Sequence, residues 1–135
     1  MKTCVIIPTY NEAKEIARLV KEIRLQNLDV LVVDDGSSDA TPRILATAAR
    51  HDRRIQIITR EGGGLVAALN AGLEACRAPL LARLDGDDIC HPRRLEQQAA
   101  YLGAHPDIGL VASNFRHFPR TGLKQGMIDY EFWQN

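Results

Sequence analysis

Cysteine is scarce in this sequence, and long apolar runs are absent from it. The three cysteines, Cys4, Cys76 and Cys90, are far apart and form no C-x-x-C pair. This spacing argues against a zinc knuckle or a disulfide framework and favours reduced thiols. No apolar run approaches the ~20 residues that a membrane-spanning helix needs, and no signal peptide precedes the first apolar segment. We therefore expect a cytoplasmic protein without a membrane span, with attachment to the inner face of the membrane as an alternative location.

An excess of charge of one sign is also lacking. Lys and Arg total 17 and Asp and Glu total 17, so the formal net charge is zero. A neutral balance argues against a nucleic-acid binder that depends on a strong basic field. The length of 135 residues and the hydrophobic content of 45% suit a single globular domain with a core of its own.

Short apolar runs alternate with helical patterns over most of the chain. Strands are expected at residues 4–8, 28–34, 55–59, 79–84 and 108–114. A helical segment follows each of the first four runs, and the tail after the last has no clear period. Such alternation predicts an α/β fold with a mainly parallel sheet, right-handed crossovers and helices on both faces. Ligands of such sheets bind outside the carboxyl ends of the strands.

An acidic cluster follows the fourth expected strand. The stretch RLDGDDICHP, residues 83–92, contains Asp85, Asp87 and Asp88, with no Lys or Arg among them. Like charges this close raise one another's pKa. Because carboxylate oxygens suit Mg²⁺ or Mn²⁺, one interpretation is a divalent ion that enters with a phosphorylated ligand. The other is a solvated acidic turn before the next helix, and His91 fits the start of that helix better than a metal site.

Two other classes of acidic motif match these residues less well. An EF-hand loop that begins at Asp85 needs an oxygen ligand at its fifth position and glycine at its sixth, where Ile89 and Cys90 stand. A phosphatase of the haloacid dehalogenase type carries its nucleophilic Asp after the first strand, whereas this motif follows the fourth expected one. Both classes are weaker alternatives to a metal-phosphate site.

Polar and glycine-rich stretches follow the first three expected strands as well. Asn11, after the first strand, is a candidate N-cap of the next helix. In VVDDGSSD, Asp34 and Asp35 stand where a carboxylate often accepts hydrogen bonds from a ribose or base, although the same letters also suit a turn. In REGGG, which ends at Gly64, bare backbone N–H groups could approach a phosphate, but a tight turn is the simpler interpretation.

Four stretches, taken together and in this order, resemble the family 2 glycosyltransferases of GT-A fold. They are VIIPTYNE, VLVVDDGSSDATPRIL, REGGGLVAALNAGL and RLDGDDICHPRRLEQQ. The resemblance covers residues 4 to about 114. It implies a Rossmann-like nucleotide-binding domain and a transferase that acts in the synthesis of cell-surface polysaccharides.

On the nucleoside side, the resemblance implies roles for four residues. Pro8 and Tyr10 line the nucleobase pocket, with Tyr10 against the ring. Asp35 hydrogen-bonds the base, and Asp34 helps beside it. The donor is then a nucleotide-diphosphate sugar, with UDP as the preferred nucleotide.

On the phosphate side, the resemblance implies a divalent metal, Mn²⁺ or Mg²⁺. Asp87 binds the ion that bridges the two phosphates, Asp85 contacts the ribose or the metal, and Gly64 belongs to the substrate-binding set. The acceptor is a saccharide or a lipid-linked saccharide, whose hydroxyl attacks the anomeric carbon with inversion after a carboxylate base removes its proton.

The resemblance also implies a division of the chain. Residues 1–114 form the donor-binding domain, and residues 115–135 connect it to a further half that carries the acceptor site and the catalytic base. Asp129 and Glu131 come too early to be that base. The edge facing that half is expected to expose apolar side chains and to favour a homo-oligomer. The alternative function is a non-catalytic nucleotide-binding or interaction module that kept the sheet and lost the chemistry.

Overall fold

The computed structural model describes residues 3–24 and 28–134. The chain forms two compact units, residues 1–95 and residues 96–135, each described by itself below. None of the helices in the described ranges is long and apolar enough to cross a membrane.

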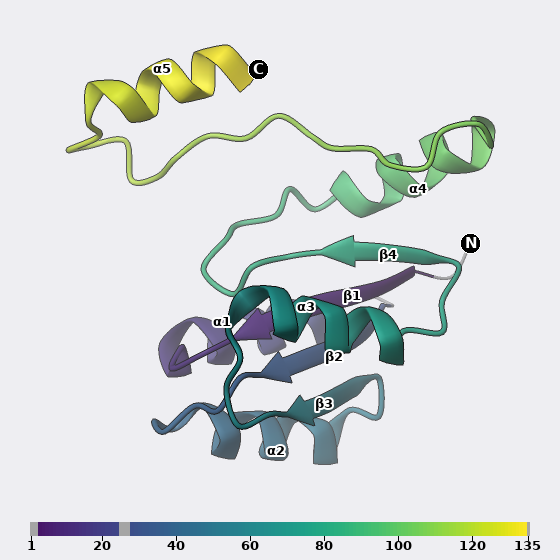
Figure 1. Cartoon of the computed structure of the whole chain (residues 1–135), viewed down its shortest axis with the longest axis vertical. Helices are drawn as coiled ribbons and strands as arrows, with labels where there is room; N and C mark the ends of the chain where they lie inside the picture. Colours follow the sequence, from purple (N-terminus) through teal and green to yellow (C-terminus); the bar gives the residue numbers. More distant parts are fainter. Residues whose placement is uncertain (1–2, 25–27, 135) are drawn as a thin grey trace. The chain divides into compact units, whose positions relative to one another are not determined.

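The first unit is built on a parallel sheet of four strands, in the order β3-β2-β1-β4 (Figure 1). The strands are β1 (Thr3–Thr9), β2 (Asp29–Asp34), β3 (Ile55–Thr59) and β4 (Leu80–Arg83). Thr9 pairs with Asp34, and Asp34 pairs with Thr59, so three strands end side by side at one edge. The first four strands expected from the sequence are therefore present and collect their carboxyl ends at that edge.

Helices cover both faces of this sheet. They are α1 (Ala13–Arg24), α2 (Thr41–His51) and α3 (Gly64–Ala75). Val5 and Ile7 of β1 belong to the core cluster that contains residues of α1 and α2. Ile6, between them, belongs to the cluster on the other face, with Ala68 of α3. This alternation follows from the period of two in a strand and confirms the α/β class with helices on both faces.

Helix α3 lies unusually close to the sheet. A Cβ atom built on Gly72 would lie 2.6 Å from Cγ2 of Ile6 and 3.3 Å from Cγ2 of Val33. Such contacts require the side chain of residue 72 to be a hydrogen atom. Glycine at this position therefore sets the spacing between α3 and the two central strands.

The second unit differs from the sequence expectation in two places. The strand expected at residues 108–114 is not formed, and Leu110 in it is 81% exposed. The tail, which has no clear apolar period, nevertheless forms helix α5 (Gln125–Gln134), after helix α4 (Arg94–Ala104). A strand needs a hydrogen-bonding neighbour, and the described part of this unit supplies none. In α5 the buried residue is Glu131, so a polar contact rather than an apolar stripe anchors the helix.

Candidate functional site

A cavity of about 570 Å³ opens at the carboxyl ends of β1, β2 and β4. Four stretches that are far apart in the sequence, one after each strand, meet there because parallel strands end at a common edge. Among its lining residues are six that the sequence singled out: Pro8, Tyr10, Asp35, Gly64, Asp85 and Asp87. Tyr10 is 61% exposed, so its ring is free to contact a ligand.

Asp34 is the predicted site residue that does not line this cavity. Its side chain is 1% exposed, and its Oδ1 accepts a hydrogen bond from the backbone N–H of Ser37 at 3.0 Å. This is a turn-forming contact of the kind that Asp makes with backbone N–H groups two or three residues on. In this structure Asp34 shapes the loop after β2.

Asp35 is held from two sides. Its Oδ2 accepts the backbone N–H of Gly64 at 2.7 Å, and its Oδ1 faces Nε of Arg60 at 3.3 Å. The side chain of Asp35 is 11% exposed, and that of Arg60 is 30% exposed. An ionised carboxylate has about four acceptor positions, so Asp35 can still accept a hydrogen bond from a ligand. The loop before α3 and the end of β2 are thus joined through this carboxylate.

The glycine loop needs glycine for its backbone. Gly62, Gly63 and Gly64 have φ angles of 98°, 141° and 81°, a region in which residues with a Cβ atom are strained. All three residues line the cavity. The loop is therefore the tight turn favoured by the sequence, and its backbone also faces the cavity.

Asn11 links the first loop to the second, and is not the N-cap expected from the sequence. It has φ of 54° and lies before α1, which begins at Ala13. Its Oδ1 accepts the backbone N–H groups of Ser38 at 2.8 Å and Asp39 at 3.2 Å. Asp39 in turn accepts the backbone N–H of Ala13, and its hydrogen bonds with Thr41 lower its pKa. The cap of α1 thus comes from a residue of the second loop.

Asp85 has a cationic partner that the sequence analysis overlooked. Arg83 donates from Nε and Nη2 to the two carboxylate oxygens of Asp85, at 2.9 Å each. The side chains of Arg83 and Asp85 are 49% and 38% exposed. Part of the positive charge that the acidic cluster lacks within residues 85–88 is therefore supplied by Arg83. The spacing of two residues was the available signal, because side chains at i and i+2 lie on one face of an extended segment, and Asp85 comes two residues after Arg83, the last residue of β4.

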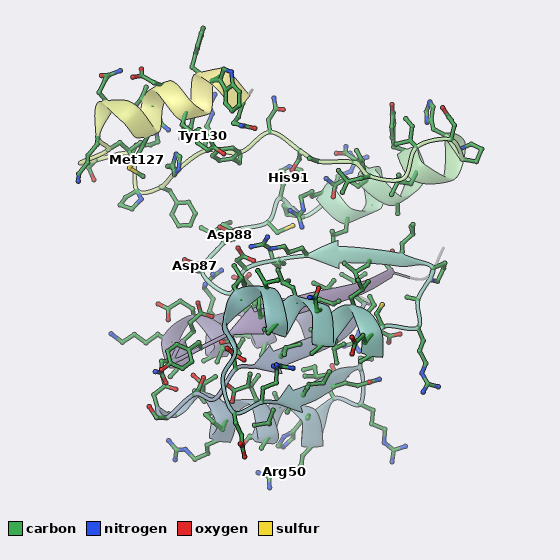
Figure 2. All side chains as sticks on the ribbon, in the orientation of Figure 1. Arg50, Asp87, Asp88, His91, Met127 and Tyr130 are labelled. Carbon is green, nitrogen blue, oxygen red and sulfur yellow. The ribbon has the colours of Figure 1, made fainter. Side chains whose placement is uncertain are left out.

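Asp87 keeps its carboxylate unpaired. No hydrogen bond or ion pair to it is found in the described part of the chain, and it lines the cavity. Figure 2 shows Asp87 and Asp88 next to each other on the loop after β4. Partial desolvation, followed by the charges of Asp85 and Asp87, raises the pKa of Asp88. Negative charge around Asp87 is thus only partly compensated within the protein.

Glu12 is a cavity residue that the motifs did not single out. Its Oε2 accepts a hydrogen bond from Oγ1 of Thr9 at 2.9 Å. Desolvation is the main cause that raises its pKa, and the charges of Asp87, Glu15 and Asp85 raise it further. In the sequence, Glu12 resembles an ordinary acidic residue at the start of a helix. Only the fold brings it beside the Asp-x-Asp turn.

The remaining metal candidate near the cluster is explained locally. Nδ1 of His91 accepts the backbone N–H of Arg93 at 3.2 Å, which is a helix-start contact. Within residues 3–24 and 28–134, no three His, Cys, Asp or Glu side chains gather closely enough to enclose a metal ion. A divalent ion at Asp87 would therefore need further oxygen ligands from a bound phosphate, which is the usual arrangement for Mg²⁺.

The acidic residues of the tail lie in the second unit and are engaged there. Glu131 is 7% exposed and accepts hydrogen bonds from Nη1 of Arg120 at 2.7 Å and from the backbone N–H of His117. The hydrogen bond from Arg120 is the largest cause that lowers the pKa of Glu131. Asp129 accepts a hydrogen bond from Gln125 at 2.9 Å. A carboxylate held ionised by Arg120 is a weak proton acceptor.

Comparison with known proteins identifies the class that this fold and cavity define. The model of glycosyl transferase family 2 matches residues 4–135. The chain therefore belongs to glycosyl transferase family 2.

Curated relatives agree with this assignment. The chain is 34% identical to the putative glycosyltransferase EpsE of Bacillus subtilis over 132 residues, which cover 94% of this chain and 48% of EpsE. It is 32% identical to the putative glycosyltransferase EpsH of the same organism, over 87% of this chain and 35% of EpsH. The chain thus spans less than half the length of either relative.

A solved structure shows the same architecture. The mannosyltransferase PcManGT from Pyrobaculum calidifontis, in complex with GDP-Man and Mn²⁺, matches with a TM-score of 0.68 and 27% identity. The match covers 75% of this chain and 32% of PcManGT. The GT-A assignment of the fold is therefore confirmed.

Proposed function

We propose that this chain is the donor-binding part of an inverting glycosyltransferase that takes a nucleotide-diphosphate sugar. The observation that carries the proposal is the cavity at the edge of the sheet, which brings Asp35 and Asp87 into one site from loops far apart in the sequence. The donor-binding part is residues 1–114, and residues 115–135 lead towards an acceptor-binding part. The relatives, which are longer than this chain, support that division.

The nucleobase end of the site is Asp35 with Pro8 and Tyr10. An ionised carboxylate accepts hydrogen bonds but donates none, so Asp35 suits a base that presents a ring N–H, as uracil and guanine do. Arg60, 3.3 Å from Asp35, adds donors for a neighbouring carbonyl oxygen. Cytosine has a ring acceptor at that place and offers the carboxylate only its exocyclic amino group. We propose UDP as the donor nucleotide, and GDP is the competing candidate because PcManGT was solved with GDP-Man.

The phosphate end is Asp87, with Asp85 beside it. Asp87 is a hard oxygen ligand with no partner in the described residues, and it therefore fits Mn²⁺ or Mg²⁺. Asp85 would have to share or release Arg83 before its oxygens reached an ion. When bound, the ion would neutralise negative charge on the leaving diphosphate. Gly64 ends the glycine loop and stays in the proposed substrate-binding set because it lines this cavity, where its N–H holds Asp35.

Transfer also requires a base and an acceptor surface. The acceptor hydroxyl must lose its proton as it attacks the anomeric carbon, and general base catalysis alone contributes about 10²–10⁴-fold. Asp129 and Glu131 are engaged by Gln125 and Arg120. We therefore expect the purified chain to bind the donor, to hydrolyse it slowly at most, and not to transfer sugar at ordinary enzyme rates. Transfer at ordinary rates would show that a base lies within the chain.

A thermal-unfolding panel tests the donor site. UDP, GDP, dTDP and CDP are each added with and without Mn²⁺, and a ligand at a hundred times its Kd should stabilise the fold by about 2.7 kcal/mol. We expect UDP with Mn²⁺ to give the largest shift. The donor-site proposal fails if none of the four diphosphates shifts the transition with Mn²⁺ present.

A non-catalytic nucleotide-binding module is the second candidate function. It would bind the same diphosphates but would not turn over a nucleotide-sugar, even when joined to the rest of a longer protein. Product analysis of this chain joined to the remaining part of a longer relative such as EpsE separates the two functions. Membership of glycosyl transferase family 2 favours the transferase.

A further inference from the structure

Glu12 lines the cavity, but the sequence motifs and the proposed donor site assign no role to it. Its backbone is fixed first. The N–H of Glu12 donates to Oγ1 of Thr41 at 3.1 Å, and Thr41 is a fully buried residue at the start of α2. The carbonyl oxygen of Glu12 accepts the N–H of Ile16, which is the first hydrogen bond of α1. The position of Glu12 is therefore tied to the core.

Its side chain is fixed next. Oε2 accepts a hydrogen bond from Oγ1 of Thr9, a buried residue at the end of β1, at 2.9 Å. The carboxylate thus projects from the residue before α1 back towards the end of β1. It does so on the side of the cavity where the loop after β4 runs.

The loop after β4 rests on this carboxylate at Gly86. A Cβ atom at Gly86 would lie 2.5 Å from Oε2 of Glu12 and 3.3 Å from its Cδ. Gly86 is buried and, unlike the glycines of the loop before α3, does not have a positive φ. An added Cβ would therefore displace the Glu12 carboxylate from its hydrogen bond with Thr9, so the constraint on residue 86 is one of space and not of backbone conformation. Gly86 is the middle residue of the Asp-x-Asp turn, so this contact bears directly on where Asp85 and Asp87 stand.

We propose that Glu12 is a positioning residue whose carboxylate supports the Asp85–Asp87 turn, and that Gly86 is glycine because Glu12 fills the space of its side chain. The role of the turn in holding a diphosphate and its metal rests on the proposed function. The packing of Gly86 on Glu12 does not depend on it.

This arrangement predicts which half of a bound ligand loses affinity when the Glu12 side chain is truncated. Without the carboxylate, the turn has free space beneath Gly86 and can move with Asp87. Asp35 is held separately by Gly64 and Arg60. The phosphate end of the site should therefore weaken while the nucleoside end keeps its geometry.

The first test is a double-mutant cycle on unfolding, which needs no ligand. Glu12→Ala, Gly86→Ala and the double variant are compared with the unchanged chain by urea denaturation. We expect Gly86→Ala to destabilise when Glu12 is present, because Glu12 must leave its hydrogen bond with Thr9, and its effect on the unfolding equilibrium constant to fall about tenfold when residue 12 is alanine. Additive effects of the two substitutions would overturn the proposed contact.

The second test uses calorimetric titration with two probes, UDP with Mn²⁺ and uridine alone. Glu12→Ala should lower the affinity for UDP with Mn²⁺ by about tenfold and leave the affinity for uridine unchanged within about twofold. Glu12→Gln keeps an oxygen acceptor for Thr9 and most of the volume, and should recover most of the affinity. Glu15→Ala, which removes a neighbouring negative charge outside the cavity, is the matched control and should bind as the unchanged chain does.

The outcomes separate this inference from the proposed function. Equal weakening of uridine and of UDP with Mn²⁺ in Glu12→Ala would overturn the positioning role. If the unchanged chain binds neither probe, the proposed function fails, and the unfolding cycle still decides whether Glu12 supports Gly86.

Discussion

Arg83 and Asp85 form a two-pronged ion pair next to the cavity, with both N···O distances at 2.9 Å. The pair occupies the oxygens of Asp85 from the side of β4. Its contribution to the folded state is small because both side chains are partly exposed, and exposed pairs typically contribute ~0.2–1 kcal/mol. Its larger consequence is electrostatic, because Arg83 compensates part of the negative charge that would attract a cation.

Replacing Arg83 with Gln should strengthen Mn²⁺ binding. The substitution frees the oxygens of Asp85 and removes a positive charge from the site. Isothermal titration with Mn²⁺ in the presence of UDP measures the change, and Arg43→Gln, on the exposed surface of α2, serves as a control for charge. Weaker Mn²⁺ binding by Arg83→Gln would mean that Arg83 itself contacts the diphosphate.

Asp87 and Asp35 should affect opposite ends of the donor. Asp87→Ala is expected to abolish the Mn²⁺ dependence of UDP binding. Asp35→Ala should instead weaken the binding of both UDP and uridine. Without metal, Asp87→Ala should also be slightly more stable, because Asp87 raises the pKa of both Glu12 and Asp88 by repulsion. Calorimetry and thermal unfolding measure these effects. Equal losses from the two variants, or none from either, would contradict the division.

Glu131 should make α5 sensitive to acid. Its pKa is lowered in the folded chain from an ordinary value of 4.5, so its contribution to stability is present above about pH 4.5 and is lost as the pH falls through the lowered value. Glu131→Gln should therefore destabilise α5 at pH 7, and the difference from the unchanged chain should shrink in acid. The fluorescence of Trp133, the single tryptophan, follows α5. Asp129→Asn is the control, and a difference that is constant with pH would contradict the prediction.

Gly72→Ala should destabilise the first unit. The added Cβ would meet Cγ2 of Ile6 at 2.6 Å, and overpacking of a close-packed core typically destabilises by ~1–3 kcal/mol. Gly109 has nothing within 4 Å of its Cβ position, so Gly109→Ala should stay within about 0.5 kcal/mol. Denaturation followed by circular dichroism compares the two. Equal stability of both variants would show that α3 can move away from β1 at little cost.

Phe132 and Trp133 should promote self-association. They are 89% and 76% exposed and adjacent on α5, and neighbouring exposed apolar side chains favour association. The double variant Phe132→Ser, Trp133→Ser should sediment as a smaller species at high protein concentration. Leu110→Ser, which removes an isolated side chain that is 81% exposed, is the control. An unchanged sedimentation profile in the double variant would place the association surface elsewhere.

The sequence by itself determined the sheet and most of the residues at its edge. The first four strands are short apolar runs, and their helices carry a local apolar period. In a parallel sheet every strand end falls on one edge, so Tyr10, Asp35 and Asp87 could be expected in one site before any coordinates were known. That inference uses only the strand order in the chain and the rule for parallel crossovers.

Only the tertiary structure decided how those residues are held. Asn11 bonds to Ser38 and Asp39, Glu12 supports Gly86, and Asp35 binds the N–H of Gly64. Each contact joins residues that are far apart in the sequence, and no local pattern encodes it. The backbone of segment 108–114 was equally beyond local prediction. Its residues have the apolar pattern of a strand, but a strand forms only where another strand offers its hydrogen bonds.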